Sequence, residues 1–520
     1  MSKQSFLKGS FILMLAGLVT KILGMINKIV LSRVIGNEGV GIYMMAYPTL
    51  LLTVTLTQLG LPVAISKMVA EADVLGDKKK IKRILVVSFT IVTVLSIVLA
   101  TVMVILGPLL SHTVFTDSRT LYPLIAISPV IPIVGIASVL RGYFQGMRHM
   151  TPFAFSEVIE QIVRISLVAF LATMLMPYGI EYAAGGAMIS GVIGEFISLL
   201  YMLSMFKKSI GKPIKLDYMK TLKSGKKTCR ELMDIALPSM GSRLIGSISS
   251  FLDPIITAQS LLIAGVSTVV ATKQYGELAG YVIPFLTLPS FITHALYVSL
   301  IPTISEEHAK KNYHIIHFRL NQALKMSMLS GGISIVICYV FAEPLMALLY
   351  HSPGSSHYVY LMAPFFIVFY LQGPLQAVLQ ALNLARAALI NSFLGAVVKL
   401  VMIWALASKP EFGINGVALG IVISMLLVTL LHLATVIKVI GFSLEIMDFV
   451  KEMSIIIASG MLATYLLNSV FTDWAMLPRT LTLIFIVFAF YLLLAFWLEL
   501  ISREELSNLP IIGKWIKIED

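Results

Sequence analysis

The amino-acid sequence predicts an all-α polytopic membrane protein with fourteen transmembrane helices. Composition is the first observation: 58% of the 520 residues are hydrophobic and 13% are charged, whereas soluble domains carry about a quarter charged residues. The mean hydropathy of +0.91 is the second. The third is that apolar stretches of about 20 residues, the length that crosses a bilayer, recur along the whole chain.

The predicted spans form a first group of six, a second group of six and a final pair. They occupy residues 9–32, 42–66, 84–107, 120–140, 152–176 and 182–206, then 232–258, 277–301, 320–341, 358–382, 387–408 and 413–437, and finally 452–471 and 478–498. The expected domains are an N-lobe (1–206), a basic cytoplasmic linker (207–231), a C-lobe (232–437) and a C-terminal part with two more helices and a tail (438–520). The short N-terminus lacks a small-residue cleavage site, so we expect a retained first helix.

Lys and Arg residues are distributed unevenly between the two sides of the predicted membrane. Segments on the side of the N-terminus hold 28, the opposite loops hold five, and six lie within spans. Because basic loops stay in the cytoplasm, this bias predicts that both termini are cytoplasmic. It also accounts for the net charge of +12 without a nucleic-acid partner.

Two pairs of similar segments indicate a parallel internal repeat. VLRGYFQGMRHMTP at Val139 matches VLQALNLARAALIN at Val378, and QLGLPVAISKMVAEA at Gln58 matches YVSLIPTISEEHAKK at Tyr297. The spacings are nearly equal, at 239 residues from Val139 to Val378 and 240 residues from Pro62 to Pro302. Parallel repeats of this kind place a substrate path at the interface between lobes. We therefore expect two six-helix lobes around a central cavity.

A polar stripe marks one predicted helix within residues 139–164. We expect a loop over 141–150 and then a helix that Pro152 opens. Two carboxylates, an amide and a guanidinium follow at positions i, i+3, i+4 and i+7, which share one helical face. These residues are Glu157, Glu160, Gln161 and Arg164. Charges inside a bilayer persist where they face a protein interior or a water-filled cavity, so the stripe predicts a polar site.

Other ionisable residues within the spans extend this site hypothesis. Lys21 and Lys28 share a face of the first span, and Arg243 lies on the seventh, which opens the second group. Such cations suit an anionic substrate such as a diphosphate, which Arg binds bidentately and Lys as a point charge. The candidate substrate-binding cations are Lys21, Lys28, Arg164, Arg243 and Lys399. The candidate ion-coupling acids are Glu157, Glu160, Glu195 and Asp253.

Structural roles are open for several of these residues. Arg164 has Glu160 one helical turn earlier and can form an ion pair with it. Glu157 can cap the start of its helix, and Asp253, which precedes a proline, can satisfy backbone groups freed by a kink. Lys325 lies near a predicted cytoplasmic end and is interpreted as a snorkelling lysine.

Motifs for catalysis, metals and cofactors are absent from the sequence. There is no GxxxxGK[ST] phosphate loop and no HExxH zinc motif. Cys229 and Cys338 lie far apart, and the nine His are scattered without ligand spacing, which is typical of ordinary surface residues. We therefore expect no cofactor, no metal site and no enzymatic activity.

Several separated segments resemble one transporter family. They are FLKGSFILMLAGLVTKILGMINKIVLSRVIGNEGVGIY, VLRGYFQGMRHMTP, GGAMISGVIGEF, LYPLIAISPV, PYGIEYAAGGAM, KQYGELAG and PLQAVLQALNLA. This text resembles the polysaccharide-transport branch of the multidrug/oligosaccharidyl-lipid/polysaccharide flippase superfamily, which includes lipid II flippases. The resemblance implies two helical bundles around an alternately open cavity, with Lys21, Lys28 and Arg243 as positions for cavity cations.

The resemblance also implies a function, the export of a lipid-linked peptidoglycan precursor for the spore cortex. Its partners would be the anionic glycan lipid, membrane lipids and cell-wall synthesis enzymes. Four alternatives stay open: a flippase for another undecaprenyl-linked polysaccharide, a multidrug/cation antiporter of the same fold, a non-transporting scaffold for cortex-synthesis enzymes, and a membrane glycosyltransferase. A cation-weighted cavity disfavours cationic drugs, and short loops disfavour a scaffold and a catalytic domain.

Overall fold

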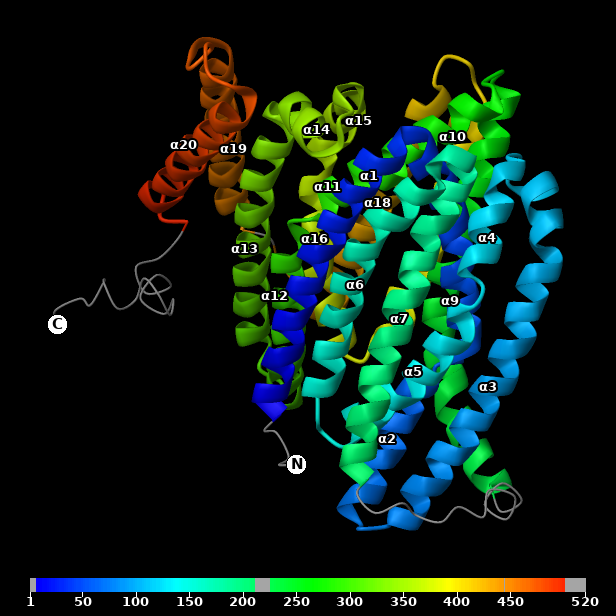
Figure 1. Ribbon diagram of the computed structural model, residues 1–520. Helices are drawn as coiled ribbons and strands as arrows, with labels where there is room; N and C mark the ends of the chain where they lie inside the picture. Colours follow the sequence, from blue (N-terminus) through cyan, green and yellow to red (C-terminus); the bar gives the residue numbers. More distant parts are fainter. Residues whose placement is uncertain (1–5, 211–224, 444, 501–520) are drawn as a thin grey trace. The chain divides into compact units, whose positions relative to one another are not determined.

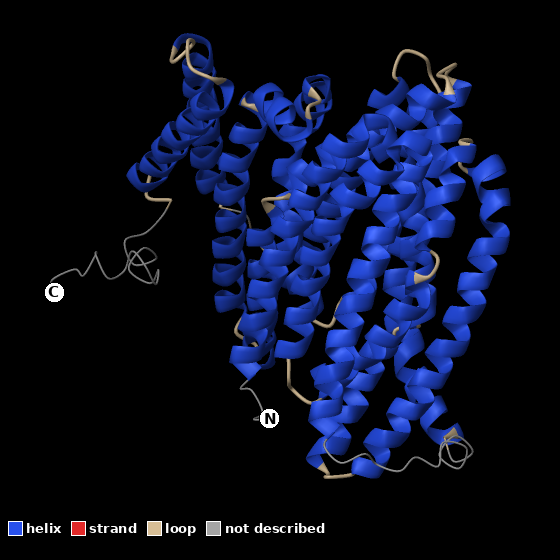
Figure 2. Ribbon diagram, in the orientation of Figure 1, coloured by secondary structure: helices blue, strands red, loops and turns tan. Residues whose placement is uncertain are grey.

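The computed structural model describes residues 6–210, 225–443 and 445–500, and every regular element within them is helical (Figures 1 and 2). The predicted all-α, polytopic class is therefore confirmed. Among these residues nine helices are long and apolar enough to cross a membrane, or eleven with two bent pairs included, so fourteen spans stay a prediction. Most of the predicted basic linker (211–224) and most of the tail (501–520) lie outside the described residues.

The chain divides into two compact units, Met1–Tyr281 with Leu400–Val417, and Val282–Lys399 with Ala418–Asp520. The predicted lobes with a boundary at 207–231 stay a prediction beside this division. Unit 1 contains α1 (Phe6–Gln58), α2 (Leu61–Val74), α3 (Lys78–Leu109), α4 (Leu121–Ile127), α5 (Val130–Gly146), α6 (Thr151–Leu175), α7 (Ile180–Ile210), α9 (Lys226–Ile263) and α10 (Thr268–Gly276). Unit 2 contains α11 (Ile283–Thr287), α12 (Ser290–Ala309), α13 (Tyr313–Val340), α14 (Ala342–Tyr350), α15 (Ser356–Met362), α16 (Phe366–Ala381), α19 (Ile446–Ser469) and α20 (Met476–Trp497). Both units share α17 (Ala385–Ala407) and α18 (Gly413–Ile440).

Gly36 interrupts α1, which is 53 residues long. Its backbone has φ 64° and ψ −175°, a conformation that favours glycine because a Cβ atom would be strained there. Figure 1 shows one part of α1 leading away from the N-terminal end and the next part returning to the end where α2 lies. The break therefore separates the two regions predicted as the first two spans.

The core of unit 1 lies between α2, α3, α5, α7 and the start of α9, with Leu61, Ile84 and Leu232 fully buried. The loop predicted over 141–150 is wrong in its first half, because α5 continues to Gly146. Gly142 and Gly146 face α2, and a Cβ atom on them would lie 2.9 and 2.7 Å from its backbone carbonyl oxygens. These glycines therefore permit close packing of two helices.

Among the described residues, unit 2 contains two apolar clusters, and α13 contributes to both. One core joins α12, α13, α16, α17 and α18, and the other joins α13 with α19 and α20. The hydroxyl of Tyr491 on α20 donates to the Leu329 carbonyl of α13 at 3.0 Å. Arg479 donates to the Leu467 and Val470 carbonyls at the end of α19, which satisfies acceptors that a helix terminus leaves open.

Candidate functional site

Five charged side chains from α5, α6 and α7 form what we call the carboxylate–arginine cluster. They are Arg141, Glu157, Glu160, Arg164 and Glu195. Arg164 Nη2 lies 2.5 Å from Glu160 Oε1 on the same helix, and Arg141 Nη2 lies 2.7 Å from Glu195 Oε1. The predicted helical stripe thus meets residues of two other helices.

Close packing of α6 on α7 positions the cluster. A Cβ atom added to Gly194 of α7 would lie 2.9 Å from the Glu160 carbonyl oxygen. One added to Gly191 would lie 3.4 Å from Arg164 Nε, so the guanidinium rests beside bare backbone. Small residues allow such close approach between helices in membranes. Any side chain at position 194 would therefore push α6 away.

The two carboxylates that pair with arginines in the cluster are buried. Glu160 and Glu195 are 9% and 4% exposed. A buried carboxylate is costly unless an opposite charge accompanies it. Arg141 and Arg164 provide the balancing positive charge. The arrangement therefore pairs two buried carboxylates with two guanidinium groups.

The other predicted site residues lie on other helices than those of the cluster. Lys21 and Lys28 are on α1, where Lys21 is exposed and Lys28 is half-buried. Arg243 is exposed on α9. Among the described residues, no hydrogen bond or ion pair joins Lys28 or Arg243 to the cluster. Asp253 on α9 has Tyr275 nearby.

Lys399 lies on α17, in unit 2. Substrate binding by the five cations and ion coupling by the four acids stay predictions. No group of three or more His, Cys, Asp or Glu in the described part of the chain could hold a metal ion.

Three functional or structural interpretations from the sequence need correction or addition. Arg141 was not among the predicted site residues, because the sequence analysis assigned it to a loop. In the structure it lies on α5, which continues to Gly146. Lys325, interpreted as snorkelling, lies 3.4 Å from Asp448 in an ion pair. His432, expected at the surface, is fully buried and its Nδ1 lies 3.1 Å from the Asn391 amide nitrogen. The partners are distant in sequence, so no local signal indicated them.

A second polar network, the Arg119 network, joins the middle of α1 to the region of α10. Arg119 contacts Glu38 and forms an ion pair with Asp117 at 2.9 Å. Asp117 also accepts a 2.9 Å hydrogen bond from Thr272 of α10. Burial acts to raise the pKa of Asp117, but the hydrogen bonds from Arg119 and Thr272 outweigh it and hold the pKa below its usual value.

The backbones of α1 and α10 also pack closely beside the Arg119 network. A Cβ atom on Gly41 would lie 2.1 Å from the Thr272 carbonyl oxygen. Asn37 donates to Glu277 at 2.5 Å and accepts from the Tyr281 hydroxyl at 3.0 Å. Residues from the first predicted group of helices are thus bound directly to residues that follow α9.

The fold and these polar sites define a helical membrane transport protein, and family models agree. A model described as "Polysaccharide biosynthesis protein" matches residues 6–308, and one described as "MatE" matches residues 267–405. The first match covers more than half of the chain. The chain belongs to the polysaccharide biosynthesis protein family, within the multidrug/oligosaccharidyl-lipid/polysaccharide flippase superfamily.

Individual proteins and solved structures are similar to this chain over most of its length. The chain is 51% identical to stage V sporulation protein B of Bacillus subtilis (strain 168) over 516 residues, 99% of this chain and 100% of that protein. It is 25% identical to the lipid II flippase MurJ of the same organism, covering 81% of each chain. A solved structure of lipid II flippase MurJ in an inward closed conformation matches with a TM-score of 0.71 at 16% identity, covering 93% of this chain and 99% of that one. An inward-facing multidrug resistance MATE family transporter matches with a TM-score of 0.65 at 16% identity, covering 81% and 94%.

Proposed function

We propose that this protein moves a lipid-linked glycan, carried on undecaprenyl diphosphate, from the inner to the outer leaflet of the bacterial cytoplasmic membrane. Its substrate would be a lipid II-like peptidoglycan precursor used for the spore cortex. The full-length, 51% identity to a sporulation protein carries this proposal. The more distant relative named as a lipid II flippase supports the substrate class. The 28-to-5 bias of basic residues supports cytoplasmic termini.

Transport would proceed by alternating access of the two predicted six-helix lobes. Within unit 1, the Arg119 network joins Asp117 and Asn37, which belong to the first predicted lobe, to Thr272 and Glu277, which belong to the second predicted lobe. By the predicted topology these residues lie toward the outer side. The contacts would have to break for a cavity to open outward, so they would act as an outer gate. The lipid tail would stay in the bilayer near the last two helices, α19 and α20.

Energy would come from an ion gradient or the membrane potential. In this mechanism Lys21, Lys28, Arg243 and Lys399 attract the diphosphate, and Arg164 exchanges its carboxylate partner for phosphate oxygens. Protonation of Glu160 would weaken its hold on Arg164 and so favour that exchange. Glu157 and Asp253 would adjust the charge balance along the path.

The test is flipping of a fluorescent lipid II analogue by the full chain in proteoliposomes. Lys21→Ala/Arg243→Ala and Arg164→Gln are expected to lose most transport, because each removes phosphate-binding charge. The matched control is Lys79→Ala, an exposed cation at the start of α3. Full transport by both charge-removing variants would refute the cavity model. Absence of lipid II transport by the folded wild type would redirect the search to other undecaprenyl-linked glycans.

A multidrug/cation antiporter is the second candidate, because a MATE family transporter shares the fold and the MatE model matches residues 267–405. Proteoliposomes loaded with a cationic dye distinguish the two activities. Dye efflux coupled to an ion gradient, without lipid II flipping, would favour the antiporter. Loss of both activities with retained binding of cortex-synthesis enzymes would favour a scaffold.

A further inference from the structure

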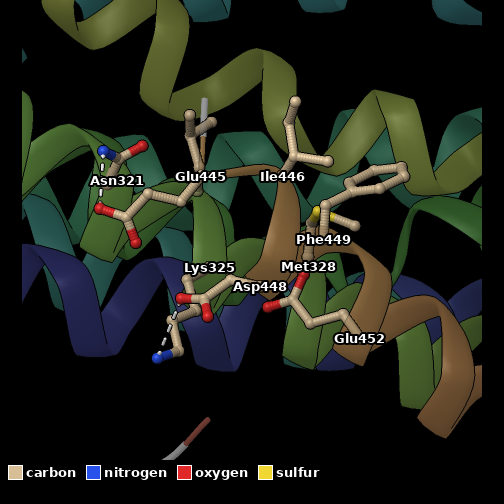
Figure 3. A pocket seen from close by; sticks show the side chains of 9 residues that line it. Asn321, Lys325, Met328, Glu445, Ile446, Asp448, Phe449 and Glu452 are labelled. Carbon is tan, nitrogen blue, oxygen red and sulfur yellow. Dashed lines mark hydrogen bonds and ion pairs between the residues drawn. The ribbon is translucent and has the colours of Figure 1, made fainter. Parts of the chain in front are cut away.

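A pocket of about 200 Å³ lies between α13 and the beginning of α19, both in unit 2. Figure 3 shows its polar side chains: Asn321 and Lys325 from α13 face Glu445, Asp448 and Glu452 around the start of α19. Three carboxylates and one lysine therefore line the pocket, and the lysine contacts Asp448. Glu445 accepts a 3.2 Å hydrogen bond from Asn321, and Asp448 pairs with Lys325.

Glu452 is the third acid of the pocket, and it takes no part in these two contacts. Its side chain lines the pocket, is 1% exposed, and has a buried Oε1 atom without a hydrogen-bond partner. Acids in the first turn of a helix are stabilised by the helix dipole, which accounts for Asp448. Glu452 lies one turn further along, beyond that effect. A buried carboxylate without a partner is costly, so the site lacks a positive group or a proton.

The residues that line the pocket favour an organic ammonium group over a metal ion. Leu324, Met328 and Phe449 line it together with the acids. A bare metal ion needs several converging oxygen ligands, and the described residues contain no such group. An ammonium group bound to carbon suits carboxylates beside apolar and aromatic side chains. Three carboxylates would repel a diphosphate, so this pocket is not the diphosphate site of the proposed function.

The same two helices carry an apolar groove of about 210 Å³ next along the chain. Val336 and Tyr339 of α13 and Ile456 and Gly460 of α19 line it, with Ile367 of α16. Tyr339 lies fourteen residues after Lys325 on α13, which corresponds to roughly 21 Å along the helix axis. An acidic pocket and an apolar groove thus follow one another along the same pair of helices.

We propose that α13 and α19 bind a lipid-like amine, with its ammonium group at Glu452 and its alkyl chain in the apolar groove. The ligand is an amphiphile that bears a primary ammonium group, either the headgroup of a phospholipid or a single-chain amine. Lys325 holds Asp448 and limits the positive charge that the pocket accepts. By the predicted topology the acidic end lies toward the cytoplasm, so the ligand enters from the inner leaflet.

The experiment measures modification of Glu452 in the full chain, in nanodiscs of phosphatidylglycerol. The probe is dicyclohexylcarbodiimide, an apolar reagent for carboxyl groups in apolar surroundings, and mass spectrometry locates the product. Dodecylamine is expected to slow the modification at least about tenfold, because it occupies the carboxylate. Hexylamine should protect less, and dodecanoate should not protect. Equal protection by dodecanoate, or none by dodecylamine, would overturn the proposal.

Further arms identify the source of the ammonium group and check the residues. Phosphatidylethanolamine added to the nanodiscs slows the reaction if the ligand is a membrane lipid; protection by dodecylamine alone identifies a single-chain amine. Lys325→Met is expected to strengthen protection, because it removes a competing cation. Glu411→Gln is the matched control, because this exposed acid lies between α17 and α18 outside the pocket, and it should leave protection unchanged. These readouts do not depend on flipping, so they stand or fall separately from the proposed function.

Discussion

The carboxylate–arginine cluster of unit 1 and the acidic pocket of unit 2 both contain buried carboxylates, but they differ in how these charges are balanced. Each places three carboxylates among apolar helices, but the cluster contains two arginines and the pocket contains one lysine. In the cluster, Glu160 and Glu195 both have a guanidinium partner. In the pocket, Glu452 has no hydrogen-bond partner for Oε1. Removal of charge should therefore destabilise the first site and stabilise the second.

The largest effect is expected for Arg164→Leu. It leaves Glu160 and Glu195 buried with one remaining arginine, and loss of one partner from a buried pair costs about 3–5 kcal/mol. Thermal unfolding of the purified protein measures the loss. The double variant Arg164→Leu/Glu160→Leu should recover most of it, because apolar replacement of a whole pair is often nearly neutral. A double variant less stable than the single one would show that the residues act independently.

A smaller loss is expected for Gly194→Ala. The added methyl group would lie 2.9 Å from the Glu160 carbonyl oxygen, so α6 and α7 must separate, at about 1–3 kcal/mol. Gly24→Ala on α1 is the matched control, because no atom lies within 4 Å of its added methyl group. In a helix that change should stabilise by about 0.5–1 kcal/mol. Similar melting temperatures for the two variants would contradict the close packing of the cluster.

The opposite sign is expected for Glu452→Gln. An amide removes a buried charge that lacks a partner, so the variant should be more stable by about 1 kcal/mol in the absence of an amine. Thermal unfolding in phosphatidylglycerol nanodiscs checks this gain. Dodecylamine should stabilise the wild type and leave the variant unchanged. A destabilised variant would show that the carboxylate already has a favourable environment.

The smallest effect concerns Asp117 and depends on pH. Its pKa in the folded protein lies below the usual value, so its ion pair with Arg119 stabilises the protein above the unfolded pKa of about 3.9. That contribution is lost as the pH falls through the folded pKa. Asp117→Asn should lower stability by about 1 kcal/mol at pH 7. The difference from wild type should disappear in melting curves at low pH, and a constant difference would implicate shape instead of charge.

Local patterns were sufficient for part of the candidate site. The spacing of Glu157, Glu160 and Arg164 predicted a shared helical face, and the ion pair between Glu160 and Arg164 has the i, i+4 geometry expected within one helix. The all-α, polytopic class followed from apolar stretches for the same reason, because it depends on residues close in sequence. Periodicity does not fix where a helix ends, and residues 141–146 were therefore misassigned to a loop.

Long-range pairing could not be predicted from one sequence. Arg141 meets Glu195 across 54 residues, and Lys325 meets Asp448 across 123. Both cations lay close to predicted helix ends, where a lysine or arginine that reaches the surface is the usual outcome. Only the packing of α5 on α7 and of α13 on α19 identifies their partners.

The interruption of α1 at Gly36 has a consequence for how the chain enters a bilayer. An unbroken helix of 53 residues would extend about 80 Å, far beyond a hydrocarbon core of about 30 Å. The reversal lets this segment cross twice, so it returns the chain to its starting side. If the reversal were lost, the number of crossings would change by one, and every later loop would face the opposite compartment. The side of the membrane that each later loop faces thus depends on the reversal at Gly36.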